Sequence, residues 1–406
     1  MDSTTSKHNL TAIKWLTFLM FMMFAMTTDS VGLIIPVVIR EFKLSMAAAG
    51  AFHYANMIAI ALAGIFLGYL ADSLGRKKTI IFGLILFALN SYLFAVGNTF
   101  LFFVVLLVIS GAAIGIFKTG ALALVGDISH STTEHTATMN TVEGFFGVGA
   151  IIGPAIVTWL LDGGFSWKWI YIIAGTICVI LILTASLVKY PKTVKSMDEP
   201  IDLKRTFGMM KDLYALGFSL GIFLYVASEC AIYVWMPTLF EGYTGSFTFV
   251  VAYATSIFFI LRVIGRFMGA WILARFNWAS VMVLFSLAIF ICFIGSMIGG
   301  LSYAIWLLPL SGLFMSMIYP TLNSKGISCF PKTEHGTVAG VILFFTCVAA
   351  AAGPWAMGVV SDIFGDPKYG FILATGFAGL LFVGMMINWI YNPAKKRLAE
   401  LDSSEY

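Results

Sequence analysis

Long apolar runs dominate this chain. Twelve segments of predominantly apolar residues follow one another, centred near residues 25, 60, 88, 114, 148, 178, 226, 260, 288, 314, 348 and 380. A membrane-spanning helix needs roughly 20 such residues, and only helices or closed barrels can cross a bilayer. The runs are continuous and do not alternate in polarity, which indicates helices. The pattern predicts an all-α membrane protein with twelve transmembrane helices.

The composition agrees with this pattern. Hydrophobic residues make up 60% of the 406 residues and charged residues only 11%, whereas roughly a quarter of the residues in a soluble domain are charged. The first run, from about Leu10 to about Arg40, is too long for a cleaved signal segment. The five cysteines stand singly, without metal-binding spacing, so we expect them to pack. We expect no metal and no cofactor, and no nucleic acid as a partner.

Lysine and arginine crowd one set of loops. They are dense at 76–78, 189–211 and 395–397, whereas the alternate loops hold only Arg40, Lys43, Lys168 and Lys368. Positive charge marks the cytoplasmic side of a membrane protein. The distribution predicts a multi-pass protein of the cytoplasmic (inner) membrane with both termini in the cytoplasm.

One long polar stretch divides the chain. Residues 189–212 contain two prolines and a run of charges, which is typical of a loop. We therefore expect an N-terminal six-helix bundle over 1–188, a cytoplasmic linker over 189–212 and a C-terminal six-helix bundle over 213–406.

The two halves share landmarks at an offset of about 200 residues. The matched positions are Gly153-Pro154 with Gly353-Pro354, Pro36 with Pro237, Ser110-Gly111 with Ser311-Gly312, and Asp29 with Glu229. Matches in one register indicate internal duplication. The sequence predicts two pseudo-symmetric copies of a six-helix unit.

The loop after the second run reads "GYLADSLGRKK", residues 68–78. It resembles the signature loop of the major facilitator superfamily. The resemblance implies a monomeric transporter that binds a small molecule between its two halves and alternates its access across the bilayer. It also implies a gating role for four loop residues: Gly68, Asp72, Gly75 and Arg76.

Further segments resemble the fucose–proton symporter family and its bacterial glucose/mannose members. They are "VEGFFGVGAIIGP" (142–154), "FLYVASECAIYVWMP" (223–237), "VIGRFMGAWILARF" (263–276), "YPTLNSKGI" (319–327) and "MGVVSD" (357–362). The resemblance implies uptake of a monosaccharide or sugar derivative, coupled to H⁺ or Na⁺. It places Arg266 in the family's Gly-Arg pair, with a structural or gating role.

Lys118 stands in the fourth apolar run, where the symporter family carries a glutamate. Lys118 lies about 14 Å along its helix from Asp127, and Glu143 lies about 18 Å from the start of the next helix, at 1.5 Å per residue. Similar depth on antiparallel neighbours predicts a Lys118–Glu143 ion pair. The alternatives are that Lys118 extends to the interface or binds an anionic solute such as a sugar acid.

Other polar residues in the spans are candidates for binding or coupling, since ionisable groups in a membrane are costly and often functional. Asp29 and Glu229 could hold sugar hydroxyls, Na⁺ or a proton. Arg262 could pair with Glu229. The remaining candidates are His53, Asn56, Asn323, which follows an expected break of its helix at Tyr319-Pro320, and the aromatic residues Tyr233 and Trp235, which could stack on a sugar.

Three classes of function remain open at this point. The first is an importer of a small polar solute, and the second is an exporter or antiporter, since "GAIIGP" (149–154) partly resembles an antiporter motif. The third is a receptor or a lipid-modifying enzyme. The sequence shows no paired catalytic set and no phosphate loop, so we do not expect an enzyme.

Overall fold

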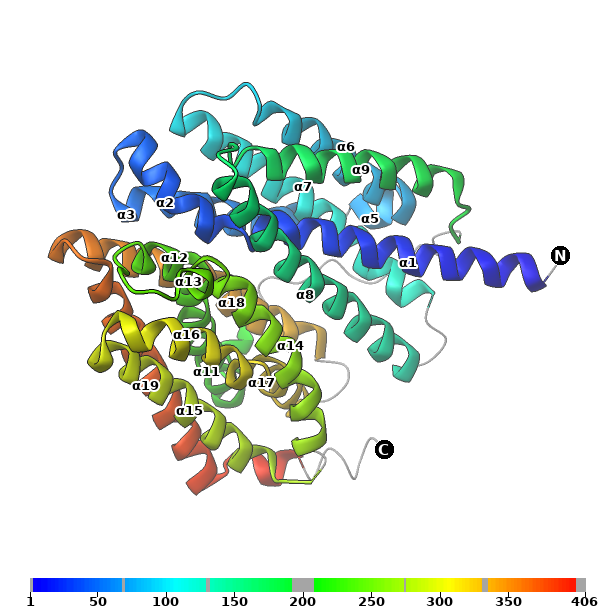
Figure 1. Cartoon of the computed structure of the whole chain (residues 1–406). Coiled ribbons are helices and arrows are strands. Elements are labelled where there is room, and N and C mark those ends of the chain that lie inside the picture. Colours follow the sequence, from blue (N-terminus) through cyan, green and yellow to red (C-terminus); the bar gives the residue numbers. More distant parts are fainter. Residues whose placement is uncertain are drawn as a thin grey trace. The chain divides into compact units, whose positions relative to one another are not determined.

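A computed structural model describes residues 3–67, 70–128, 132–191, 208–273, 275–330 and 335–398 (Figure 1). Within these ranges the secondary structure is helical. Most of the expected linker, residues 192–207, lies outside the described residues, and so does Gly68.

The chain divides into two compact units. Unit 1 comprises Met1–Leu44 and Ala51–Asp198, and unit 2 comprises Ser45–Gly50 and Glu199–Tyr406. The short segment Ser45–Gly50 therefore belongs to unit 2, although both of its sequence neighbours belong to unit 1.

Unit 1 is built from helices of 4 to 31 residues. They are α1 (Ser3–Thr28), α2 (Val31–Phe42), α4 (Ala51–Leu67), α5 (Leu70–Ser73), α6 (Arg76–Leu93), α7 (Phe100–Asp127), α8 (Thr132–Asp162) and α9 (Trp169–Leu187). Phe24 of α1 forms the centre of an apolar core, where its ring contacts those of Phe87 on α6 and Phe117 on α7.

Unit 2 contains α3 (Met46–Ala49) and the helices of the second half of the chain. These are α11 (Leu213–Cys230), the π-helix η1 (Ala231–Trp235), α12 (Met236–Phe240), α13 (Thr248–Ala252), α14 (Ala254–Leu273), α15 (Trp278–Gly299), α16 (Leu301–Met315), α17 (Ile318–Ser328), α18 (His335–Phe364) and α19 (Pro367–Tyr391).

Eleven helical segments in the described part of the chain are long and apolar enough to cross a membrane. Several combine two consecutive helices, such as Asn9–Phe42, which joins α1 to α2. Helix α6 is 18 residues long and begins with three basic residues, so it is not among the eleven, but it occupies the place of the expected third span. The predicted all-α fold with twelve spanning helices is confirmed.

The duplicated glycines lie at equivalent helix contacts in the two units. A Cβ atom added at Gly111 would lie 2.4 Å from the Asn56 carbonyl oxygen, and one added at Gly312 would lie 2.4 Å from that of Phe258. Each glycine thus allows one helix to approach the backbone of its neighbour, a role that a residue without a side chain fills best. The repeat found in the sequence therefore corresponds to a repeat in packing.

Three spanning helices are interrupted. Helix one breaks at Asp29-Ser30 between α1 and α2, and helix seven changes to a π-helix at Ala231, directly after α11 ends. The tenth spanning helix breaks at 316–317, between α16 and α17, just before the break that the sequence predicted at Tyr319-Pro320. The first interruption includes the matched acid Asp29, and the second begins two residues after Glu229. Short π-helical segments occur frequently at functional sites.

Candidate functional site

A buried charged centre lies within unit 2. The Arg262 guanidinium Nη2 lies 2.7 Å from Glu229 Oε1, and the Tyr225 hydroxyl donates a hydrogen bond to the same oxygen at 2.8 Å. The Glu229 side chain is 9% exposed and that of Arg262 is 21% exposed. We refer to Tyr225, Glu229 and Arg262 as the charged centre. Arg262 thus pairs with Glu229, which is one of the partners that the sequence left open for it.

Helix geometry explains how this centre forms. Tyr225 and Glu229 are four residues apart on α11, so their side chains lie on one face of the helix. Arg262 comes from α14. The sequence analysis did not single out Tyr225, although its spacing from Glu229 was the signal that could have identified it.

Aromatic and polar side chains extend the charged centre. The ring of Tyr319, at the start of α17, lies 6.4 Å from that of Tyr225. Asn323, a predicted ligand, is half-buried one turn further along the same helix. Tyr233 lies in the π-helix, where its hydroxyl is 2.8 Å from Cys230 Sγ and its ring 6.2 Å from that of Phe259.

Trp235 does not fit its predicted role. It is 1% exposed, and its indole N–H donates a hydrogen bond to the Pro354 carbonyl oxygen at 3.0 Å. An indole ring with so little exposed surface has no face on which a sugar could stack. The prediction for Trp235 is wrong, and the residue instead ties the end of the π-helix to α18.

Arg266 lies one turn beyond Arg262 on α14 and is half-buried. The preceding Gly265 packs tightly, because a Cβ atom there would fall within van der Waals contact of the Leu313 carbonyl oxygen on α16. Gly265 therefore allows α14 to lie close against α16.

The matched acid of unit 1, Asp29, is hydrogen-bonded to its sequence neighbour. The Asp29 carboxylate accepts a hydrogen bond of 2.7 Å from the hydroxyl of its neighbour Thr28. Two further candidates, His53 and Asn56, are buried on α4. A Cβ atom at Gly111 would lie 2.9 Å from Asn56 Oδ1, so this amide lies in the contact between α4 and α7.

The predicted Lys118–Glu143 pair does not form within the described part of the chain. The Lys118 ammonium lies 5.3 Å from the centroid of the Phe146 ring on α8, in a cation–π contact. Glu143 lies three residues earlier on the same helix, and it is exposed, whereas Lys118 is half-buried. The depth estimate brought Lys118 to the correct neighbouring helix, but its ammonium lies against Phe146, about one turn along α8 from Glu143.

The signature loop is held within unit 1 by its basic residues. Arg76 Nε donates to Asp127 Oδ2 at 2.9 Å, which links the start of α6 to the end of α7. Gly75 has φ = 87°, a conformation that favours glycine. Lys77 donates to the carbonyl oxygens of Ser186 and Val188. The Asp72 side chain lies outside the described part of the structure.

Lys77 also lies over an aromatic ring beside this loop. Its ammonium is 5.4 Å from the centroid of Tyr190, and burial raises the pKa of Tyr190 to about 12.

A second polar contact, absent from the sequence analysis, lies in unit 2. Asp362, near the end of α18, accepts hydrogen bonds from the backbone N–H groups of Met46 and Ala47 at 2.7 and 2.8 Å. Gly358 makes room for this approach, since a Cβ atom there would lie 2.9 Å from Ala47 Cα. A carboxylate at a helix N-terminus satisfies free N–H groups and is favoured by the helix dipole. We refer to this contact as the α3 clasp.

Two halves with repeated landmarks, and interrupted helices beside the acids Asp29 and Glu229, are typical of a membrane transporter that works by secondary transport. The family comparison agrees, since residues 17–354 match the model of the Major Facilitator Superfamily. The chain belongs to that superfamily and is a transporter, not an enzyme.

Curated relatives include drug-resistance proteins. Multidrug resistance protein 2 of Bacillus subtilis is 22% identical over 373 residues, which cover 88% of this chain and 91% of that protein. Quinolone resistance protein NorA of Staphylococcus aureus is 31% identical over 172 residues, which cover 40% of this chain and 42% of that protein.

Solved structures with the same fold include transporters of polar solutes. The nucleoside transporter NupG aligns with a TM-score of 0.74 and 17% identity over 93% of this chain and 98% of its own. A D-xylose–proton symporter aligns with 0.73 and 13% over 92% and 96%, and the E. coli fucose–proton symporter FucP with 0.65 and 21% over 92% and 98%. At these identities the likeness shows the fold alone.

Proposed function

We propose that this transporter carries a small, hydroxyl-bearing solute, a monosaccharide or sugar derivative, across the cytoplasmic membrane, and that the charged centre couples this movement to a cation. The observation that carries the proposal is the buried Glu229 carboxylate, which is shared between the Arg262 guanidinium and the Tyr225 hydroxyl.

The charged centre is suited to coupling because its charge balance depends on a single carboxylate, that of Glu229. A proton or Na⁺ on Glu229 cancels the charge that Arg262 faces, and a weakened pair lets α11 and α14 rearrange. The π-helix that begins two residues after Glu229 gives α11 a place to change its geometry. A buried charge pair that can be neutralised by an ion is a two-state element of the kind that coupled transport needs.

The neighbouring side chains suit a polar solute. The Tyr319 hydroxyl and the Asn323 amide, which are both half-buried, can exchange hydrogen bonds with sugar hydroxyls, and an aromatic ring can lie against the apolar face of a sugar. The fold neighbours that are sugar or nucleoside transporters support this choice.

A second candidate is the export of a larger organic compound in exchange for protons. The relatives in the drug-resistance group support this candidate. It differs from the first in its solute and direction, but it uses the charged centre in the same way.

Transport in reconstituted vesicles separates these candidates. The purified chain would be tested for counterflow of labelled fucose, glucose, mannose and xylose, and for efflux of a cationic dye, under imposed H⁺ or Na⁺ gradients. We expect sugar counterflow, and accumulation with only one of the two gradients. Dye efflux without sugar counterflow would replace the first candidate with the second.

The coupling role has its own test. Glu229→Gln keeps the size of the side chain but removes its charge, so gradient-driven accumulation should be lost. Glu143→Gln is the matched control, because Glu143 is exposed, and it should transport as the unchanged protein does. Accumulation at the unchanged level in Glu229→Gln would refute the coupling role.

A further inference from the structure

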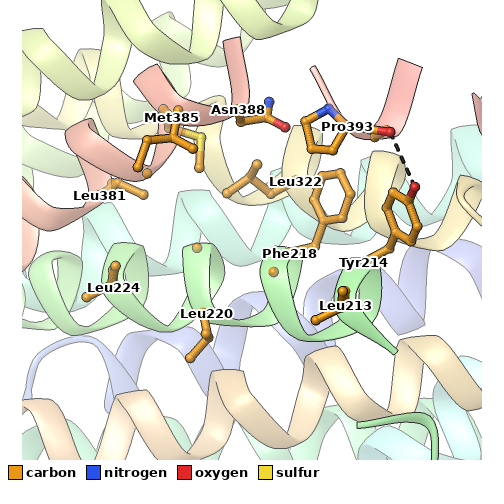
Figure 2. A pocket seen from close by; sticks show the side chains of 15 residues that line it. Leu213, Tyr214, Phe218, Leu220, Leu224, Leu322, Leu381, Met385, Asn388 and Pro393 are labelled. Carbon is orange, nitrogen blue, oxygen red and sulfur yellow. Dashed lines mark hydrogen bonds between the residues drawn. The ribbon is translucent and has the colours of Figure 1, made fainter. Parts of the chain in front are cut away.

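An open apolar groove lies between α11 and α19 of unit 2. It has a volume of about 290 Å³, with Leu220 and Leu224 on one wall, Leu381 and Met385 on the other, and Leu322 of α17 at its floor. Figure 2 shows Leu224 and Leu381 at one end of the groove and Leu213, Tyr214 and Pro393 at the other. Nothing in the proposed transport cycle uses this groove.

Glycine keeps the groove open. A Cβ atom added at Gly217 on α11 or at Gly384 on α19 would meet open space, and both glycines line the groove. Glycine in a helix interior is unfavourable by roughly 0.5–1 kcal/mol relative to alanine. Two glycines that line one groove and border open space are therefore consistent with a bound molecule that needs the room.

The dimensions of the groove match one leaflet of a bilayer. From Leu213 to Leu224 the wall formed by α11 covers twelve residues, or about 16 Å of helix between the first and the last. The hydrocarbon core of a bilayer is roughly 30 Å thick, so half of it is about 15 Å. The groove begins where α11 starts and α19 ends, which places its polar end at a membrane surface.

The polar end of the groove carries excess positive charge. Arg397 is engaged locally, since it lies 3.5 Å from Asp212 and donates to the Cys329 carbonyl oxygen at 2.7 Å. Lys211, which precedes α11, and Lys395 and Lys396, which follow α19, are exposed. Basic pockets between spanning helices on the cytoplasmic side are suited to anionic lipid headgroups.

The same end offers a hydrogen-bond donor. Asn388 lines the groove, and its buried Nδ2 has no hydrogen-bond partner in the described part of the chain. Figure 2 shows Asn388 beside Pro393, whose carbonyl oxygen accepts a hydrogen bond of 3.4 Å from the Tyr214 hydroxyl. An ester or phosphate oxygen at this depth would satisfy the Asn388 amide.

We propose that the groove between α11 and α19 binds one anionic phospholipid, with an acyl chain between Gly217 and Gly384 and its headgroup at Lys211, Lys395 and Lys396. Lipid tails are as apolar as leucine, so the acyl chain gains little by leaving the bilayer. Selectivity therefore comes from the headgroup, and the fit of the chain into the groove fixes the position.

Native mass spectrometry of the full chain in detergent tests the proposal, with dioleoyl phosphatidylglycerol as the probe and dioleoyl phosphatidylcholine as the neutral comparison. We expect one tightly retained phosphatidylglycerol, and binding of this lipid at least tenfold tighter than that of phosphatidylcholine. Lys395→Gln with Lys396→Gln should weaken only the anionic lipid, by about fivefold per lysine.

A pair of variants on α19 locates the site. Gly384→Leu fills the groove and should abolish the retained lipid, whereas Gly376→Leu is the matched control, since Gly376 also faces open space but does not line the groove. Gly217→Leu blocks the opposite wall and replaces Gly384→Leu if that variant does not fold. Equal binding of both lipids, or retention in both groove variants, would overturn the proposal. A lipid-free dimer that Gly384→Leu dissociates would also overturn it, because a second copy would then cover the groove.

Discussion

The two units share a scaffold and differ in their charges. In unit 1, Gly111 of α7 lies against the Asn56 carbonyl oxygen of α4. In unit 2, Gly312 of α16 lies against the Phe258 carbonyl oxygen of α14 in the same way. Unit 2 adds an ion pair and a tyrosine hydroxyl to its matched acid, whereas at the corresponding positions unit 1 has Ala25 in place of Tyr225 and Ile60 in place of Arg262. Duplication therefore preserved the helix contacts, while apolar residues stand in unit 1 where Tyr225 and Arg262 stand in unit 2.

The largest effect should come from breaking the charged centre. Arg262→Leu leaves the buried Glu229 carboxylate without its guanidinium, and stranding one member of a buried pair costs about 3–5 kcal/mol. We expect a large loss of thermal stability in detergent and no transport. Glu229→Gln with Arg262→Leu should recover stability better than Arg262→Leu alone. A double variant that is less stable than either single variant would contradict a coupled pair.

The next largest effect tests whether the helices of the two units pack equally closely at the matched glycines Gly153 and Gly353. A Cβ atom at Gly153 on α8 would lie 2.3 Å from the Met26 carbonyl oxygen, whereas one at Gly353 on α18 would lie 3.0 Å from Ala227. Overpacking costs about 1–3 kcal/mol, so Gly153→Ala should lie at the upper end of that range and Gly353→Ala at the lower end, as measured by thermal unfolding.

Gly144→Ala is the control for this comparison. Gly144 also lies on α8, but an added Cβ atom there would meet open space, so the change should be neutral or stabilising. If Gly353→Ala proved the more damaging of the two tight positions, unit 2 would be the more closely packed half at this contact.

A smaller effect concerns Lys118 in unit 1. Its cation–π contact with Phe146 predicts a loss of about 0.5–2 kcal/mol in Lys118→Met. Because Lys118 and Glu143 form no pair, the effects of Lys118→Met and Glu143→Leu should add within roughly 0.5 kcal/mol in the double variant. A double variant markedly more stable than the sum of the two single effects predicts would show that Lys118 and Glu143 do form an ion pair. Unit 1 would then contain a charged pair, as unit 2 does.

The smallest effect should come from Asp29. Asn at this position keeps an oxygen that can accept the hydrogen bond from Thr28, so Asp29→Asn should change stability by less than about 1 kcal/mol and leave accumulation intact. The same assay on Glu229→Gln supplies the contrast. Equal loss of accumulation in both variants would mean that the two matched acids work together.

Sequence patterns predicted the spanning helices, the duplicated unit and the break of helix ten, because each depends on local composition or on spacing along the chain. The break at Asp29-Ser30 and the π-helix at Ala231–Trp235 depend instead on backbone geometry set by neighbouring helices. The Lys118–Glu143 prediction was wrong because a count of residues gives depth along a helix but not the direction in which a side chain points. For the same reason the sequence could not show that Trp235 is enclosed.

The two partners in the α3 clasp, the backbone of α3 and the side chain of Asp362, should differ in how well they tolerate substitution. Asp362 receives main-chain N–H groups from Met46 and Ala47, and every residue type except proline supplies such a group. The half-buried side chains of Ala47 and Ala48 can therefore vary without removing the hydrogen bonds, whereas Asp362 supplies both acceptor atoms from a single side chain. A saturation library should accordingly show more tolerance at Ala47 and Ala48, apart from proline, than at Asp362.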